Sequence, residues 1–237
     1  KMIIQFLILF IFILVMYLYV INKPIKENFS SSLKLTDTFI RRKAHEFRKI
    51  LIKTKEVLDS LEIPFFLSSG TLLGYYRENK FLDHDYDVDI GIFAKDYTPE
   101  IKTRMQDAGF DNYRNLGNPS DGYEMSFYLK DSHLKKIAKI DIFLHYKETV
   151  DNEDYMYWTS YEIPELKKKI KYRVPYFTIK EDTFYNVKVN VPEDTLKYIV
   201  NHYGEDWKTP KYLGVSYDYR VSPASIVKSD SCGGKTR

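Results

Sequence analysis

The sequence has little cysteine, little net charge and no internal repeat. Cys232 is the single cysteine among 237 residues, so no intramolecular disulfide framework can form. Lysine and arginine number 36 against 33 aspartates and glutamates, and the resulting net charge of +3 is too small to predict nucleic-acid binding. The 44% of hydrophobic and 29% of charged residues are typical of a globular domain.

Residues 2–21 form a long hydrophobic run. The run contains Gln5 and no charged residue, and about 20 apolar residues suffice to cross a bilayer as a helix. A cleaved signal peptide, which is the alternative, has a shorter apolar stretch and a cleavage site of small residues. We therefore expect residues 1–21 to be a retained transmembrane anchor of a single-pass, type II membrane protein, followed by a linker over residues 22–35.

Residues 36–221 are expected to form one domain, and residues 222–237 a flexible tail. Apolar residues recur every three or four positions between Thr36 and Leu61, which predicts a long helix. Further helices are expected over Thr71–Arg77, Pro99–Ala108 and Pro192–Tyr203, and strands over Ile63–Leu67, Asp85–Phe93, Gly122–Leu129 and Ile137–His145. This order of elements predicts an α+β fold with a mixed β-sheet and flanking helices.

Four aspartates fall within the seven residues "DHDYDVD". Side chains alternate between the two faces of a strand, so a strand from Asp85 places Asp85, Asp87 and Asp89 on one face. The other face would bury Tyr86, Val88, Ile90 and Ile92. Crowded carboxylates repel one another, and a hard divalent cation such as Mg²⁺ or Mn²⁺, which prefers oxygen ligands, removes that repulsion.

A further carboxylate, Asp141, lies between two isoleucines in "KIDIF". If its strand neighbours the first, Asp141 joins Asp87 and Asp89, and three carboxylates suit a centre whose two metal ions, about 3.5–4 Å apart, grip a phosphate. Asp87, Asp89 and Asp141 are therefore the predicted metal ligands. Either Asp141 or Asp85 is the predicted acceptor of a proton from an attacking hydroxyl group.

The stretch "SSGTLLG" precedes the acidic strand and indicates a phosphate-binding turn. Gly70, Thr71 and Gly74 stand where a glycine turn leads into a helix, and backbone amides at a helix start bind phosphate. Arg77 lies one helical turn beyond Gly74 and can add a charge-assisted contact. These four residues are the predicted substrate-binding residues.

Two other interpretations fit the acidic strand alone. It could be a solvated edge strand or a calcium-binding loop, although the glycine and glutamate of an EF-hand loop are absent from their positions. It could also be the short Asp-x-Asp motif with which a glycosyltransferase holds a sugar nucleotide. Any acidic strand produces that motif, so neither interpretation is excluded by the strand itself.

The string "SSGTLLGYYRENKFLDHDYDVDIGIF" resembles the LicD family, which includes phosphocholine transferases and fukutin-type proteins. "KIDIF" resembles the later aspartate strand of the family, and "VPEDTLKYIVNHYGEDWKTP" resembles its C-terminal helix and the segment after it. The resemblance covers about residues 36–212. Asp83 and His84 stand where the family usually has Pro-Trp, and Tyr86 stands where it often has Asp, so the donor alcohol stays open.

The resemblance implies a nucleotidyltransferase-like fold and a metal-dependent transferase. Such an enzyme moves a phosphoalcohol, such as choline phosphate or ribitol phosphate, from a CDP-linked donor to a glycan hydroxyl group. Tyr203, Gly204 and Trp207 would shape the acceptor side, and an anchored enzyme of this kind would face the lumen of the Golgi or the ER. The alternatives are a nucleotidyltransferase that leaves the nucleotide monophosphate on its acceptor, and a non-catalytic, membrane-tethered scaffold.

Overall fold

The computed structural model describes residues 37–132, 139–161, 168–212 and 214–227. The chain divides into two units, residues 1–43 and residues 44–237, and the sheet and the cavity lie in the second. The expected anchor over residues 1–21 and the linker over residues 22–35 lie outside the described residues. Within the described part of the chain, no helix combines the length and the apolar character needed to cross a membrane.

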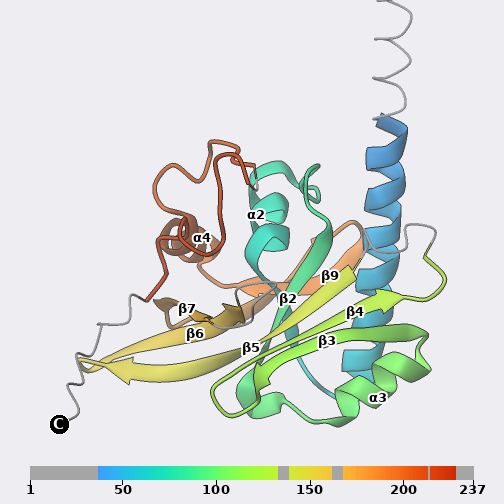
Figure 1. Ribbon diagram of the computed structural model, residues 1–237, viewed down its shortest axis with the longest axis horizontal. Helices are drawn as coiled ribbons and strands as arrows, with labels where there is room; N and C mark the ends of the chain where they lie inside the picture. Colours follow the sequence, from blue (N-terminus) through green and yellow to red (C-terminus); the bar gives the residue numbers. More distant parts are fainter. Residues whose placement is uncertain (1–36, 133–138, 162–167, 213, 228–237) are drawn as a thin grey trace, which may run out of the picture. The chain divides into compact units, whose positions relative to one another are not determined.

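A mixed β-sheet organises the second unit (Figure 1). Its strands are β1 (Phe65–Leu67), β2 (Asp87–Phe93), β3 (Phe110–Asn118), β4 (Gly122–Leu129), β5 (Lys139–Val150), β6 (Glu153–Tyr161), β7 (Lys169–Pro175), β8 (Ile179–Phe184) and β9 (Val187–Pro192). The helices are a segment over residues 37–60, α2 (Ser69–Glu78), α3 (Glu100–Asp107) and α4 (Thr195–Tyr203), and a 3₁₀ turn spans Ala94–Asp96. The α+β class with a mixed sheet is confirmed.

The strands lie in the order β3-β4-β5-β2-β1-β9-β8, and β6 pairs with both β5 and β7. The pairs β2–β5 and β1–β9 are parallel, and the other pairs are antiparallel. Strand β5 changes partners along its length. Its first part pairs with β2 and β4, and its last part, from Tyr146 to Val150, pairs with β6. The long strand therefore joins the central sheet to the β6–β7 hairpin.

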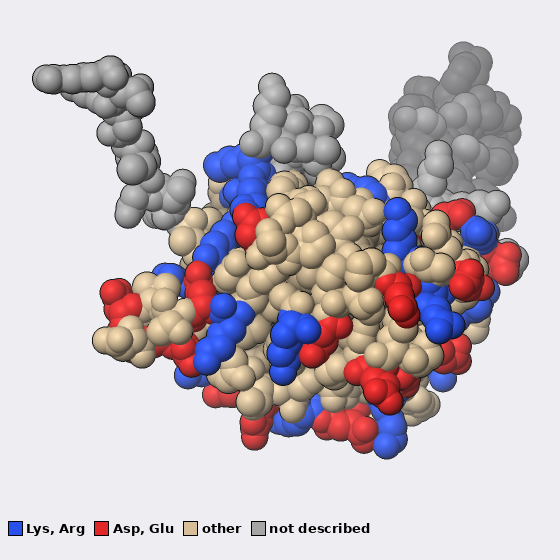
Figure 2. All heavy atoms as spheres, turned by 90° about the horizontal axis from the view of Figure 1, so that it is seen from below, with Lys and Arg blue, Asp and Glu red and all other residues tan. Residues whose placement is uncertain are grey.

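Hydrophobic residues cover one face of the acidic strand as predicted. Val88, Ile90 and Ile92 are fully buried, and Phe47, Ile50 and Leu51 of the long helix are part of the same core. On the face drawn in Figure 2, acidic and basic side chains are interspersed, which matches the small net charge of the chain.

Several predicted boundaries differ from the structure: β5 runs to Val150 rather than His145, β1 begins at Phe65 rather than Ile63, and α2 begins at Ser69 rather than Thr71. Strand β2 begins at Asp87 rather than Asp85, because the chain makes a turn at residues 83–84 and the Asp85 amide donates to the Leu82 carbonyl at 3.1 Å. Tyr86 consequently precedes the strand and is 58% exposed instead of buried. Pro192 ends β9 and does not begin a helix, since the Asp194 carboxylate caps α4 by accepting from the Lys197 amide.

The segment after Ser222 does not begin as a flexible tail. Ile226 forms a β-bridge with Tyr172, and the Arg173 amide donates to the Ser225 carbonyl at 2.8 Å. The Ser225 hydroxyl lies 2.6 Å from Nδ1 of His202 on α4. Ordered packing thus extends beyond the expected boundary at residue 221, and residues 228–237 lie outside the described residues.

Two buried histidines pack against Trp158 in the core. The rings of His145 and His202 lie with their centroids 4.9 Å and 5.0 Å from that of Trp158. Burial lowers the pKa of each histidine to about 3. Both side chains are therefore neutral in the folded protein at neutral pH.

The histidine pair should make stability fall on mild acidification. Each folded pKa lies below the unfolded value of about 6.5, so the unfolded chain binds more protons, and the stability present above pH 6.5 is lost as the pH falls towards 3. We expect His202→Asn to reduce the slope of unfolding free energy against pH by about 1.4 kcal/mol per pH unit below pH 6. Urea unfolding between pH 7 and 4.5 measures this slope, and parallel curves for the two proteins would contradict the expectation.

Candidate functional site

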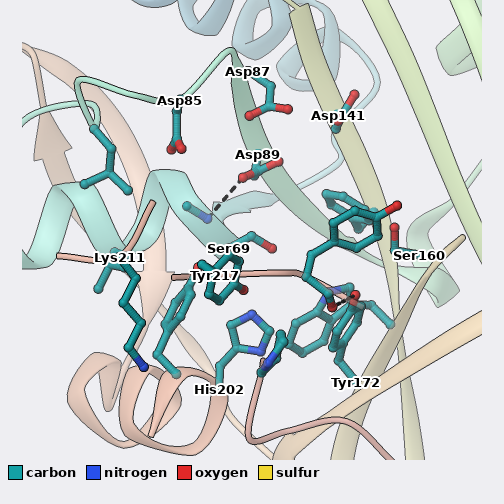
Figure 3. A pocket seen from close by; sticks show the side chains of 18 of the residues that line it. Ser69, Asp85, Asp87, Asp89, Asp141, Ser160, Tyr172, His202, Lys211 and Tyr217 are labelled. Carbon is teal, nitrogen blue, oxygen red and sulfur yellow. Dashed lines mark hydrogen bonds between the residues drawn. The ribbon is translucent and has the colours of Figure 1, made fainter. Parts of the chain in front are cut away.

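Three predicted metal ligands come together on neighbouring strands. The parallel register of β2 and β5 sets Asp89 opposite Asp141 and Asp87 opposite Lys139. Side chains opposite each other on neighbouring strands share a face, and one carboxylate oxygen from each of Asp87, Asp89 and Asp141 lies within 4.8 Å of the others. Figure 3 shows these side chains at one end of a cavity. The prediction that Asp141 joins the β2 pair is confirmed.

The first turn of α2 is bonded directly to this cluster. The Gly70 amide donates to Oδ2 of Asp89 at 3.1 Å, and the Thr71 hydroxyl accepts from the Asp89 amide at 2.8 Å. A Cβ atom on Gly70 would lie 2.6 Å from Oδ2 of Asp85 and 3.3 Å from Oδ2 of Asp89. Glycine therefore lets the positive N-terminal end of the helix approach the carboxylates closely.

The other predicted residues lie around the cluster in different roles. Gly70, Asp85 and Arg77 line the cavity, with Asp85 in the loop before β2 and next to Gly70. Thr71 and Gly74 are buried and are not among the cavity-lining residues. A Cβ atom on Gly74 would lie 2.5 Å from the Lys80 carbonyl oxygen, so this glycine allows close backbone packing. Thr71 and Gly74 thus lie behind the cavity wall, where Thr71 bonds to the Asp89 amide.

The cavity has a volume of about 290 Å³ and two chemically different ends. Asp85, Asp87, Asp89 and Asp141 lie at one end, and His202 and Tyr172 lie at the other (Figure 3). The aromatic part is lined by Trp158, Tyr172, His202, Tyr203, Trp207, Tyr217 and Tyr219. Tyr203 and Trp207, expected on the acceptor side, therefore line the cavity.

Cationic side chains lie on the α2 side of the cavity. Arg77 and Lys211 are among its lining residues. The Arg77 guanidinium donates to Oε1 of Glu78 at 2.7 Å and to the Trp207 carbonyl at 3.2 Å. Arg77 thereby joins the last turn of α2 to the segment that follows α4.

Lys139 is a site residue that our reading of the sequence did not assign. Its ammonium group donates to Oδ2 of Asp87 at 2.7 Å and also to Asp141. Burial alone would lower the pKa of Lys139, but the charges of Asp141 and Asp87 outweigh burial and raise it above its ordinary value. A signal was present, because strand alternation puts Lys139 on the same face as Asp141.

Glu124 is a second missed residue, on β4. It is 2% exposed and lines the cavity. Burial and the charge of Asp141 raise the pKa of Glu124 to about 7, although Arg114 acts in the opposite direction. The strand Gly122–Leu129 was predicted with its observed bounds, but the sequence does not show that β4 lies beside β5. The position of Glu124 in the site could therefore not be predicted from the sequence.

The carboxylate cluster fits a hard divalent cation. Its ligand atoms are all carboxylate oxygens, the type that Mg²⁺ and Mn²⁺ prefer. Oδ1 of Asp141 is buried and has no hydrogen-bond partner among the described residues. Burial, followed by the charges of Asp87 and Asp141, raises the pKa of Asp89 well above its ordinary value. A bound cation would relieve the second condition, because it would neutralise the charge around Asp89.

Comparison with known proteins gives a family match. Residues 62–194 match the model of the family described as "LicD/FKTN/FKRP, nucleotidyltransferase domain". The matched range contains the α2 turn, the β2 aspartates and Asp141, and it also contains Lys139 and Glu124. It ends one residue before α4 begins.

Curated relatives share this part of the chain. The ribitol-5-phosphate transferase FKTN of Homo sapiens is 38% identical over 186 residues, and that of Mus musculus is 37% identical over the same length. An uncharacterized Caenorhabditis elegans protein is 27% identical over 197 residues, which are 80% of this chain and 49% of that protein. The matches to both transferases cover 78% of this chain and 37% of the relative.

Removing Lys139 should strengthen metal binding. Its ammonium group contacts oxygens of Asp87 and Asp141 that a divalent cation would also bind. We expect Lys139→Met to bind Mn²⁺ at least tenfold more tightly, which corresponds to about 1.4 kcal/mol. Calorimetric titration with Mn²⁺ measures the change.

Lys169→Met is the matched control, because Lys169 pairs with Asp121 outside the cavity. Its affinity for Mn²⁺ should equal that of the unchanged protein. Weaker binding of Mn²⁺ by Lys139→Met would instead show that the lysine holds the two carboxylates in place. It would disprove the idea that the Lys139 ammonium group competes with the cation for their oxygens.

Proposed function

The chain belongs to the LicD/FKTN/FKRP nucleotidyltransferase-domain family, and from this premise we propose that it is a metal-dependent phosphoalcohol transferase. The donor would be CDP-linked, and the acceptor would be a hydroxyl group of a glycan. The observation that carries the proposal is the carboxylate cluster of Asp87, Asp89 and Asp141 beside the N-terminus of α2. Of the alcohols that the family resemblance implies, ribitol is favoured by the names of the FKTN relatives.

One side of the carboxylate cluster suits the donor phosphates, and the other side suits the attacking hydroxyl group. A divalent ion on the carboxylates would neutralise the donor diphosphate and stabilise the departing CMP. On the α2 side, the helix N-terminus and the charges of Arg77 and Lys211 favour the phosphates. Donor phosphate is thus drawn to one wall of the cavity.

The proton acceptor would lie on the other side of the cluster. Asp85 lies against Gly70, on the phosphate side. Asp141 is on β5, across β2 from this helix end, and its Oδ1 atom is without a hydrogen-bond partner in the described part of the chain. We therefore assign to Asp141 the removal of the proton from the attacking hydroxyl group.

Product analysis tests this proposal against its two alternatives. The whole chain is incubated with Mn²⁺, CDP-ribitol or other CDP-alcohols, and a set of methyl glycosides, and the products are weighed by mass spectrometry. Release of CMP with a glycoside that gains ribitol phosphate supports the proposal. A glycoside that gains CMP would show a nucleotidyltransferase instead. Absence of turnover with every donor would favour a non-catalytic scaffold.

Asp89→Asn should abolish transfer without unfolding the domain. The asparagine keeps an oxygen for the Gly70 amide but loses the metal-binding charge. Because burial and neighbouring charges disfavour the Asp89 carboxylate, we expect an unchanged or higher melting temperature and a loss of at least a hundredfold in kcat. Asp121→Asn, which changes an exposed aspartate paired with Lys169, is the control. A rate near that of the unchanged protein would disprove the role of Asp89.

We also propose that residues 1–21 anchor the domain in the ER or Golgi membrane, with the domain in the lumen. The uncharged apolar run supports this proposal. Membranes from cells that express the whole chain should retain it in alkaline carbonate and protect it from added protease. Loss of the chain to the soluble fraction would contradict the anchor, and digestion in sealed vesicles would contradict the orientation.

A further inference from the structure

The wall of the cavity beyond Asp141 carries a polar group with no role in the proposed transfer. Glu124 of β4, Arg114 of β3 and Ser160 of β6 line the cavity together. The antiparallel register sets Ser126 opposite Asp141 and Glu124 opposite Phe143, so Glu124 shares a face with Asp141 and lies diagonally from it. Ser160 and Lys211 lie on opposite sides of the cavity in Figure 3.

The hydrogen bonds within this group are long. The Arg114 guanidinium and the Ser160 hydroxyl each donate to the Glu124 carboxylate at 3.4 Å. Several surface ion pairs of the same chain are shorter, as in the 2.7 Å contacts of Lys169 with Asp121 and of Lys55 with Asp59. Nε of Arg114 is buried and has no hydrogen-bond partner in the part of the chain that the structure describes. A buried polar group with weak or missing partners is costly, and a ligand that supplies those partners would remove the cost.

The chemistry of the wall selects a neutral, hydroxyl-rich ligand. The carboxylate accepts hydrogen bonds, the guanidinium donates them, and the serine hydroxyl does both. When ionised, Glu124 balances the charge of Arg114, so the group offers little net positive charge to a phosphate. Trp158, two residues before Ser160 on β6, adds an apolar aromatic surface to the same cavity, and such surfaces beside a few polar groups are typical of small-molecule sites.

We propose that Glu124, Arg114 and Ser160 form a binding site for the hydroxyl groups of an uncharged polyol. The carboxylate and the guanidinium bind neighbouring hydroxyl groups as acceptor and donor. The proposal rests on the proposed function for the position of this polyol, which lies across Asp141 from the phosphate side. The polyol has two sources in that reaction, the alcohol of the donor and the sugar of the acceptor.

A site of this kind governs which substrate is used. A protein site built to bond a hydroxyl group discriminates strongly against an analogue that lacks it, because the buried polar groups of the site are then left without partners. Glu124 and Ser160 would thus select the polyol, whereas the metal ligands would act on any donor of the same class.

Binding measurements with the whole chain test the proposal without requiring turnover. The variants are Glu124→Gln, which keeps the shape of the side chain, and Ser160→Ala. Glu148→Gln is the control, since Glu148 of β5 pairs with Lys171 and is not a lining residue. The probes, all with Mn²⁺, are CMP, which has no polyol beyond its ribose, CDP-ribitol, and the methyl glycosides of galactose, N-acetylgalactosamine, mannose and xylose.

The expected result is that both variants bind CMP as the unchanged protein does and lose at least tenfold in affinity for one class of polyol probe. A loss with CDP-ribitol assigns the site to the donor alcohol, and a loss with a glycoside assigns it to the acceptor. Unchanged affinity for every probe would overturn the proposal. An equal loss for CMP would also overturn it, because it would show a general electrostatic effect on the metal site.

These measurements separate the two hypotheses. If the unchanged protein bound neither CMP nor CDP-ribitol, the proposed function would fail, and the glycosides would still test the polyol site. If CMP and CDP-ribitol bound normally to Glu124→Gln and Ser160→Ala and no glycoside discriminated between the proteins, the polyol site would fail and the proposed function would stand.

Discussion

The parallel pairing of β2 with β5 is the constraint on which the rest of the structure depends. It sets Asp89 opposite Asp141 and so concentrates negative charge where both side chains are largely buried. Crowded carboxylates in such a place are unfavourable unless positive charge or hydrogen-bond donors surround them. The Gly70 amide and the Lys139 ammonium group meet this need from opposite sides. The pairing of β2 with β5 thus explains three other features: the close approach of α2, the glycine at position 70 and the lysine on β5. Each of them offsets the negative charge that the pairing concentrates.

Strand β5 extends this arrangement to the whole cavity. Its first half carries Lys139, Asp141 and Phe143 beside β2, and its second half pairs with β6, which brings in Trp158 and Ser160. The ionic end of the cavity therefore lies on the first half of β5, and the partner of its second half contributes to the aromatic end. The neutral rings of His145 and His202 pack against Trp158 at this end, and His202 itself lines the cavity.

Features that depend only on neighbouring residues could be predicted from the sequence, and features that depend on contacts between distant segments could not. Alternation along a strand is local, so it identified the faces of Asp87, Asp89 and Asp141. Which strands become neighbours depends on long-range packing, so Glu124 was not recognised although its own strand was. Turn geometry also escaped prediction, because the bond from the Asp85 amide to the Leu82 carbonyl delays the start of the acidic strand to Asp87. Glycine at positions 70 and 74 looks alike in sequence, yet one faces carboxylates and the other faces a backbone carbonyl.

The cavity is divided between two stretches of chain, and the boundary of the family match falls between them. The match ends at residue 194, after all of the carboxylates, whereas His202, Tyr203, Trp207, Lys211, Tyr217 and Tyr219 come later. The acidic centre and much of the aromatic wall thus come from different stretches of the chain. Substitutions among these six late lining residues would therefore reshape what enters the cavity while the acidic centre is left intact, which makes them the natural place for evolution, or an engineer, to change selectivity.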